Sequence, residues 1–128
     1  MHMLLFLTSL ATGFLPGVVA ADPTAALNLA RSGDFDTIFE ARCAQDVRQP
    51  PAVCRAAVAR AGDAAAVVVT FPNGFARTLT LADGKFLRGN PTMSGVGTDT
   101  EWRLMDGTYH IRVDDQRFEL PARLVFQE

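Results

Sequence analysis

Lysine and histidine are scarce in this sequence of 128 residues. Lys85 is the single lysine beside eleven arginines, and the two histidines are His2 and His110. The formal net charge is −2, so the chain lacks the basic excess that attracts nucleic acid. Its length suits one domain.

The shortage of histidine also restricts catalysis and metal binding. His110 is the one histidine beyond the first twenty residues, and the serines there, Ser32 and Ser94, lie in no nucleophile-elbow pattern. Zinc needs three or four His, Cys or carboxylate ligands, and Asp114-Asp115 does not match the calcium-loop spacing. We therefore expect a protein that is not an enzyme and holds no metal or cofactor.

The first twenty residues contain no Lys, Arg, Asp or Glu. A mostly apolar run over residues 4–15 is broken by Pro16-Gly17, and small residues follow up to Ala20. This layout predicts a secretory signal peptide over 1–20 and a single mature domain over 21–128. The alternative is an inner-membrane anchor formed by residues 3–21, which is barely long enough to span. The expected location is therefore periplasmic or secreted, in a bacterium.

Two cysteines, Cys43 and Cys54, remain in the mature chain. An even number of cysteines in an exported protein favours a disulfide, and a pair of buried free thiols is the alternative. The bridge would close a loop of about a dozen residues and contribute on the order of 3 kcal/mol.

The mature chain begins with a segment, 22–62, that reads as two or three short helices. Asp22-Pro23 resembles a helix start, and Gly33 a helix end. Two apolar sets with helical spacing follow on either side of Pro50-Pro51: Phe35, Ile38, Phe39 and Cys43, then Cys54, Ala57, Val58 and Ala61. We expect a helical hairpin that the disulfide links.

From residue 64 to residue 126 the sequence alternates apolar and polar residues between turn signals. The turns are expected at Pro72-Asn73-Gly74, Asp83-Gly84, Asp106-Gly107 and Asp115-Gln116, with a short edge strand at 124–126. The predicted fold class is therefore α+β. A helical hairpin precedes a six- to seven-stranded antiparallel meander, which can curl into a small barrel.

The Asp106-Gly107 turn fixes a register with one apolar face and one charged face. On the apolar face the expected pairs are Trp102 with Ile111 and Leu104 with Tyr109, followed by Ile111 with Leu120 and Val113 with Phe118. On the charged face they are Arg103 with His110 and Glu101 with Arg112, which then meets Glu119.

Two surfaces are candidates for binding another envelope protein. One is the long loop 90–99, with Met93, Ser94 and Gly95. The other is the charged sheet face, with Arg103, His110 and Arg112. The simpler interpretations are a plain crossover loop and a solvated face whose charge pairs fix the register.

The Ser94-Gly95 loop, in a small exported β-domain with a disulfide, resembles the bacterial periplasmic inhibitors of C-type lysozyme. That family is mostly barrel, without a helical hairpin in front, and a Ser-Gly loop followed by an aromatic residue enters the lysozyme cleft. Here Thr98 stands where the aromatic residue is expected. The resemblance implies an inhibitor of a cell-wall hydrolase as one alternative function. An accessory subunit of a membrane complex facing the periplasm is another.

Overall fold

The structure, a computed structural model, describes residues 20–89 and 99–126. The predicted signal peptide and the alternative anchor fall almost wholly outside these ranges. Met93, Ser94 and Gly95 also lie outside the described residues, so the expectations for them remain predictions.

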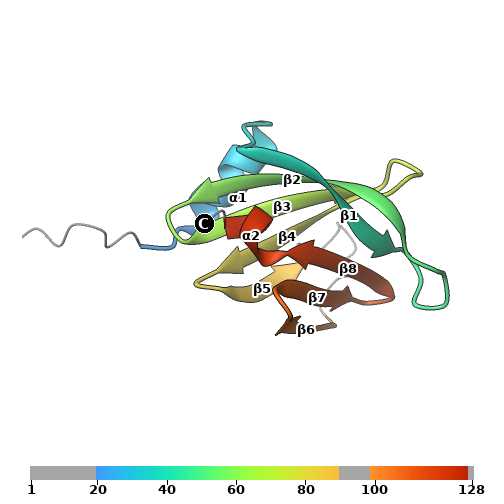
Figure 1. Cartoon of the computed structure of the whole chain (residues 1–128). Helices are drawn as coiled ribbons and strands as arrows, with labels where there is room; N and C mark the ends of the chain where they lie inside the picture. The colour runs from blue at the N-terminus through green and yellow to red at the C-terminus, as the bar shows by residue number, and fades with distance from the viewer. Residues whose placement is uncertain (1–19, 90–98, 127–128) are drawn as a thin grey trace, which may run out of the picture.

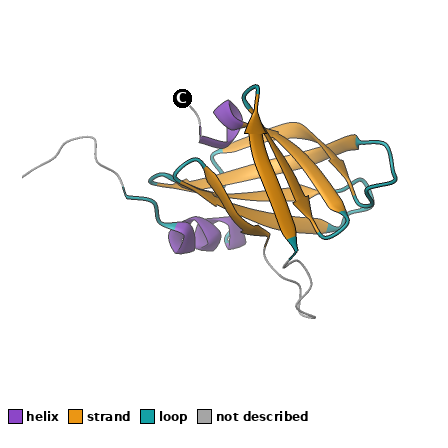
Figure 2. Ribbon diagram, turned by 90° about the horizontal axis from the view of Figure 1, so that it is seen from below, coloured by secondary structure: helices purple, strands orange, loops and turns teal. Residues whose placement is uncertain are grey.

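Eight antiparallel strands form a nearly closed, barrel-like sheet with one short helix outside it and another at one end (Figures 1 and 2). The elements are α1 (Pro23–Arg31), β1 (Thr37–Ala44), β2 (Ala52–Ala61), β3 (Ala64–Thr70), β4 (Ala76–Ala82), β5 (Lys85–Gly89), β6 (Thr100–Met105), β7 (Thr108–Val113), β8 (Gln116–Pro121) and α2 (Ala122–Phe126). The order across the sheet is β5-β4-β3-β2-β1-β8-β7-β6. Each strand therefore neighbours the next along the chain, except that β1 pairs with β8 and β5 does not pair with β6.

The predicted helical hairpin is wrong, and with it the α+β fold class. Of the expected helices only the first exists: Asp22 caps α1 by accepting a hydrogen bond from the Ala25 N–H at 3.0 Å. The segments expected to form the other two are β1 and β2. One face of β1 carries every second residue of the strand toward the core: Phe39, Ala41 and Cys43. This spacing of two is that of a strand, although the same segment also contains apolar residues at helical spacing.

The many alanines of β2 explain why its sequence predicts a helix although it forms a strand. Ala56 and Val58 face the barrel interior, whereas Ala59 faces α1, so the strand is buried on both sides and shows no polar alternation. Ala26 and Ala30 of α1 pack onto this outer layer of alanines. Small side chains on both surfaces let the helix lie close to the sheet, and burial then outweighs the helical preference of alanine.

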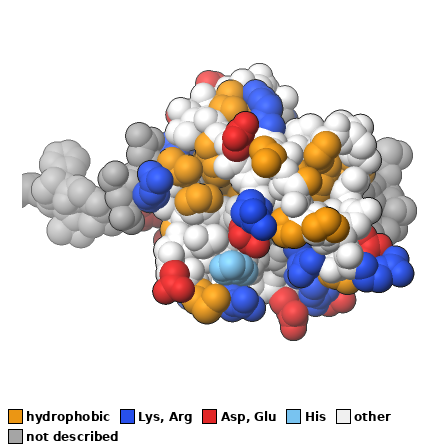
Figure 3. Space-filling view, turned by 45° about the vertical axis from the view of Figure 1, so that its right-hand side comes forward, with side chains coloured by type: hydrophobic (Ala, Val, Ile, Leu, Met, Phe, Trp, Pro, Cys, Tyr) orange, Lys and Arg blue, Asp and Glu red, His pale blue; other side chains and the backbone are white. Residues whose placement is uncertain are grey.

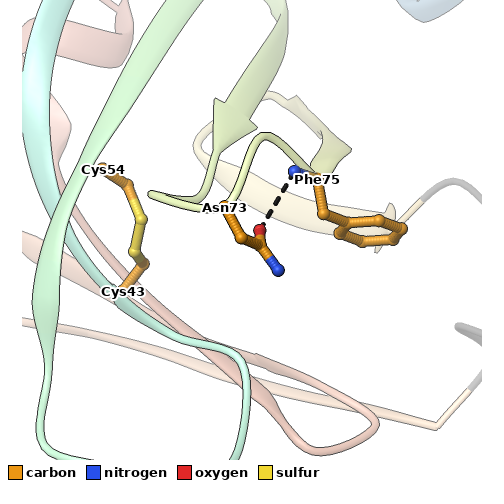
Figure 4. The surroundings of a disulfide bond; sticks show 4 residues. All are labelled: Cys43, Cys54, Asn73 and Phe75. Atoms are coloured by element: carbon orange, nitrogen blue, oxygen red, sulfur yellow. Dashed lines mark hydrogen bonds between the residues drawn. A yellow bond between two sulfur atoms is a disulfide. The ribbon is translucent and has the colours of Figure 1, made fainter.

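The predicted disulfide between Cys43 and Cys54 is present (Figure 4). It joins adjacent strands, β1 and β2, rather than helices. Cys54 lies opposite Ala41, and Cys43 lies opposite Ala52, so the bridge runs diagonally across the strand pair with Cα atoms 6.0 Å apart. Both sulfurs face the barrel interior, and each cysteine is only 2% exposed.

Three of the four predicted turns are confirmed. Asp83 and Asp106 adopt left-handed φ angles of 55° and 53°, each followed by a glycine with positive φ, as a two-residue hairpin loop requires. At the 72–74 turn the Phe71 N–H donates to the Phe75 carbonyl at 2.8 Å, and Asn73 accepts from the Phe75 N–H at 3.1 Å (Figure 4). The register of β6 on β7 is also as predicted, including Trp102 opposite Ile111.

The fourth turn lies one residue earlier than predicted, at Asp114-Asp115. Asp114 has a φ of 52°, and β8 begins at Gln116. The partners on β8 therefore shift by two residues: Phe118 faces Ile111, and Leu120 faces Tyr109. Because the shift is even, the apolar side chains stay on the inner face. The predicted edge strand at 124–126 is likewise wrong, since these residues belong to α2.

The hydrophobic core fills the barrel interior, and each end carries a buried or half-buried arginine. Arg60 donates from Nε to the Val125 carbonyl at 2.8 Å and from Nη2 to the Leu124 carbonyl at 2.6 Å. These bonds satisfy carbonyls that α2 leaves unpaired and hold fully buried Val125 in place. Near the opposite end, buried Arg77 donates to the Gln116 side chain at 2.7 Å.

The barrel closes through side chains where β5 meets the inner side of β7. The Tyr109 hydroxyl donates to the Gly84 carbonyl at 2.7 Å. Farther along, Gly89 lies so near Val113 that an added Cβ would stand 2.9 Å from a Val113 methyl carbon. Strand β5 therefore meets β7 through these side chains and lies near β6 without a hydrogen-bonded ladder. Trp102, on the inner face of β6, remains 39% exposed.

Removing the disulfide is expected to lower the free energy of unfolding by about 3 kcal/mol, because the unfolded chain regains the entropy of a closed loop. The measurement is urea denaturation of the wild type and the Cys43→Ala/Cys54→Ala variant, each with and without reductant. Reductant should lower the denaturation midpoint of the wild type and leave that of the variant unchanged. An unchanged wild-type midpoint under reduction would show that the bridge does not stabilise the fold.

Gly89→Ala is expected to lower the free energy of unfolding by about 1–3 kcal/mol, because the methyl group would overlap buried Val113. Arg88→Ala, at the exposed neighbouring position, is the control. In a Val113→Ala background the same glycine substitution should cost less, since the overlap is removed. Equal costs in the two backgrounds would contradict this closure.

Candidate functional site

A groove of about 790 Å³ lies on the outer face of the sheet, over β1, β8, β7 and β6. Thirteen residues line it: Arg42, Cys43, Ala44, Pro51, Glu101, Trp102, Arg103, His110, Ile111, Arg112, Arg117, Phe118 and Glu119. The space-filling view shows a face on which basic, acidic and hydrophobic side chains lie around the displayed histidine (Figure 3). Four arginines against two glutamates give this lining a net positive charge, whereas the whole chain carries −2.

One row of charged and polar side chains crosses the groove on four adjacent strands. Arg103 of β6 pairs with His110 of β7, His110 pairs with Glu119 of β8, and Glu119 pairs with Arg42 of β1. Since neighbouring strands lie about 4.8 Å apart, the row spans roughly 14 Å. Arg42 also forms an ion pair with Glu119 at 3.6 Å, and its side chain remains 62% exposed.

A second row, beside the first, is occupied by internal ion pairs. Arg112 forms ion pairs of 3.3 Å with both Asp99 and Glu101, and it donates to the Asp114 carbonyl at 2.9 Å. The hydrogen bonds that Arg112 donates to the Asp99 and Glu101 carboxylates raise the pKa of Arg112 above its ordinary value. The predicted contact of Arg112 with Glu119 is wrong, because the shifted turn places Arg117 opposite Arg112.

Arg117 holds one wall of the groove in place rather than forming its floor. Its Nη2 donates to the Val47 carbonyl at 2.7 Å, which ties the loop between β1 and β2 to β8. Within that loop Arg48 donates to Asp46 through Nη2 at 2.8 Å and through its backbone N–H at 2.9 Å. These bonds hold the pKa of the Asp46 carboxyl well below its ordinary value, so the loop keeps this ion pair under mildly acidic conditions.

Arg42 and Arg103 are therefore the cations of the groove that a partner could engage most readily. Arg103 is exposed, and no hydrogen bond or ion pair joins its side chain to another described residue. Arg42 has one ion pair, which is exposed and so contributes little on its own. An acidic segment laid along the row would meet Arg103 at one end and Arg42 at the other, with His110 and Glu119 between them.

The structure brings together three of the residues predicted from sequence, Arg103, His110 and Arg112, on one face. Sequence reasoning missed Arg42 because its segment was assigned to a helix. The alternation of Glu40 and Arg42 with inward Ala41 and Cys43 was the signal that could have revealed it.

Over the residues that the structure describes, no cluster of three or more His, Cys, Asp or Glu side chains could hold a metal ion. Nor does any helix within 20–89 and 99–126 have the length and apolar character needed to cross a membrane.

Comparison of the sequence with protein-family models and curated proteins, and of the structure with solved structures, found no significant match.

Proposed function

We propose that this protein is a small exported, non-enzymatic protein of the bacterial periplasm. It binds another envelope protein through the outer face of β1, β8, β7 and β6, where an acidic segment of that partner lies in the groove. The Cys43–Cys54 disulfide supports the export part of this proposal, because such bridges persist in oxidising compartments. The signal-peptide pattern in residues 1–20 supports it as well.

The observation that carries the binding proposal is the exposed pair Arg42 and Arg103 at the two ends of one cross-strand row. Arginine presents several donors in a planar fork, so it binds carboxylates better than a point charge does. The neighbouring Arg112 and Arg117 are already engaged with the protein itself and keep the face rigid. A preformed cationic row on a rigid sheet loses little entropy when a partner binds.

Reversing the charge of the groove should remove partner binding. Oxidised protein is immobilised, exposed to envelope extract and compared with two variants, Arg42→Glu and Arg42→Glu/Arg103→Glu. We expect severalfold lower capture of one envelope protein by the first variant and at least roughly tenfold lower capture by the second. Capture should also weaken as salt rises from low to physiological concentration, because exposed charges are screened.

The matched control is Arg31→Glu/Arg88→Glu, which makes the same charge change on α1 and β5, away from the groove. A synthetic polyglutamate peptide serves as a defined probe, with binding followed through the fluorescence of Trp102, the single tryptophan. If groove and control variants capture the same proteins equally, the groove is not the binding surface. The 90–99 loop would then be tested next.

The barrel-like sheet with its disulfide supports a second candidate, an inhibitor of a cell-wall hydrolase. The resemblance to the lysozyme inhibitors implies a mostly barrel fold without a helical hairpin in front. The described part of the chain also lacks that hairpin, so Thr98 in place of the aromatic residue is the remaining difference from the family. A purified C-type lysozyme should then lose activity at micromolar excess of the protein, and Ser94→Ala should restore that activity. Full lysozyme activity in the presence of wild type would end this candidate.

A further inference from the structure

The two ends of the sheet differ in how their free edges are protected. Strand β5 has five residues, a register shift against β4 and a lysine at its start, three features that discourage pairing with another chain. Strand β6 has six residues in unbroken register with β7 and contains neither lysine nor proline. In the described part of the chain, no strand pairs with the second edge of β6.

Strand β6 is also exposed along nearly all its length. Residues 101–105 are all exposed, and three of them are large and apolar: Trp102 at 39%, Leu104 at 49% and Met105 at 45%. By contrast, the apolar side chains of neighbouring β7, Tyr109, Ile111 and Val113, are buried. An exposed, regular, apolar edge strand is a template for a further strand.

We propose that a second copy of this chain pairs with β6, so that two sheets join edge to edge through antiparallel β6 strands. A two-fold axis through Trp102 places Glu101 of each copy opposite Arg103 of the partner subunit. On the inner face, the two Trp102 residues meet, and Leu104 lies opposite Thr100 of the partner subunit. Both charges of the strand are thereby matched, and its aromatic residue lies at the centre.

Other registers that keep each face continuous are less favourable. An axis through Glu101 would oppose two glutamates, and an axis through Arg103 would oppose two arginines. An axis through Leu104 would leave both charges without an opposite partner and would set Trp102 against Asp106 of the partner subunit's turn. The sequence of β6 is thus complementary to itself in one register.

This pairing would extend the groove. The first row of one copy ends at Arg103. Across the interface it continues into Glu101 and Arg112 of the partner subunit, which belong to the partner subunit's second row. The outer face becomes one trough that both copies build, with opposite charges adjacent where they meet. This inference and the partner-binding proposal share Arg103, whereas Arg42 is distant from the new interface, so Arg42→Glu tests partner binding without altering the edge strand.

The test is the molar mass of the purified, oxidised protein by light scattering and sedimentation over a concentration series up to about 100 µM, a range that detects weak edge pairing. Wild type should approach twice the mass of one chain. We expect each of two single substitutions, Glu101→Arg and Arg103→Glu, to raise the concentration at which half of the protein is dimeric at least roughly tenfold. Each substitution places like charges opposite one another across the interface. An equimolar mixture of the two variants should restore the dimer, since two arginines then face two glutamates.

Circular dichroism confirms that each variant is folded, and Arg42→Glu, outside the interface, should dimerise like wild type. A wild type of single-chain mass throughout the series would overturn the proposal. So would a dimer that both charge variants retain, or a mixture no more associated than its components. If the wild type does not dimerise but still captures its partner, only this inference fails. If it dimerises but captures no partner, only the proposed function fails.

Discussion

The absence of a hydrogen-bonded ladder between β5 and β6 is the constraint on which the rest of this structure depends. The strand order is that of an up-and-down barrel in which seven of the eight neighbouring pairs are made. At the eighth position, backbone pairing is replaced by the Tyr109–Gly84 hydrogen bond and by the close approach of Gly89 to Val113. Strand β5 lies near β6 without pairing with it, and the apolar side chains Trp102, Leu104 and Met105 of β6 stay exposed.

The same constraint shapes the outer face. Strand β6 is held by β7 and by ion pairs, above all those of Arg112 with Asp99 and Glu101. These pairs are exposed and individually weak, but together they fix the strand that forms one border of the groove. The opposite border is fixed by the bond from Arg117 to the Val47 carbonyl. The groove is therefore supported from both sides by arginines whose donors are directed at the protein itself.

Sequence reasoning succeeded where short-range chemistry determines the outcome. Asp-Gly turns at 83–84 and 106–107 set the register of their hairpins, and the cysteine count indicated the disulfide. It failed where tertiary burial decides. Strands β1 and β2 contain alanine and cysteine at spacings that fit a helix as well as a strand. Burial under α1 favours the strand for β2, through Ala59, and β1 is held by ladders to both β2 and β8. Of the residues that line the groove, the sequence indicated Arg103, His110 and Arg112 because the register of β6 on β7 was predicted correctly, whereas Arg42 was missed with β1.

The pairing of β1 with β8 has a consequence for how the molecule is made. Arg42 meets Glu119, so an early strand completes its second ladder only when a strand from the far end of the sequence arrives. Contacts between residues so distant in sequence slow folding and delay it until most of the polypeptide has been synthesised. A nascent chain of this topology stays unfolded for longer than a helical one, which is compatible with the export that we propose.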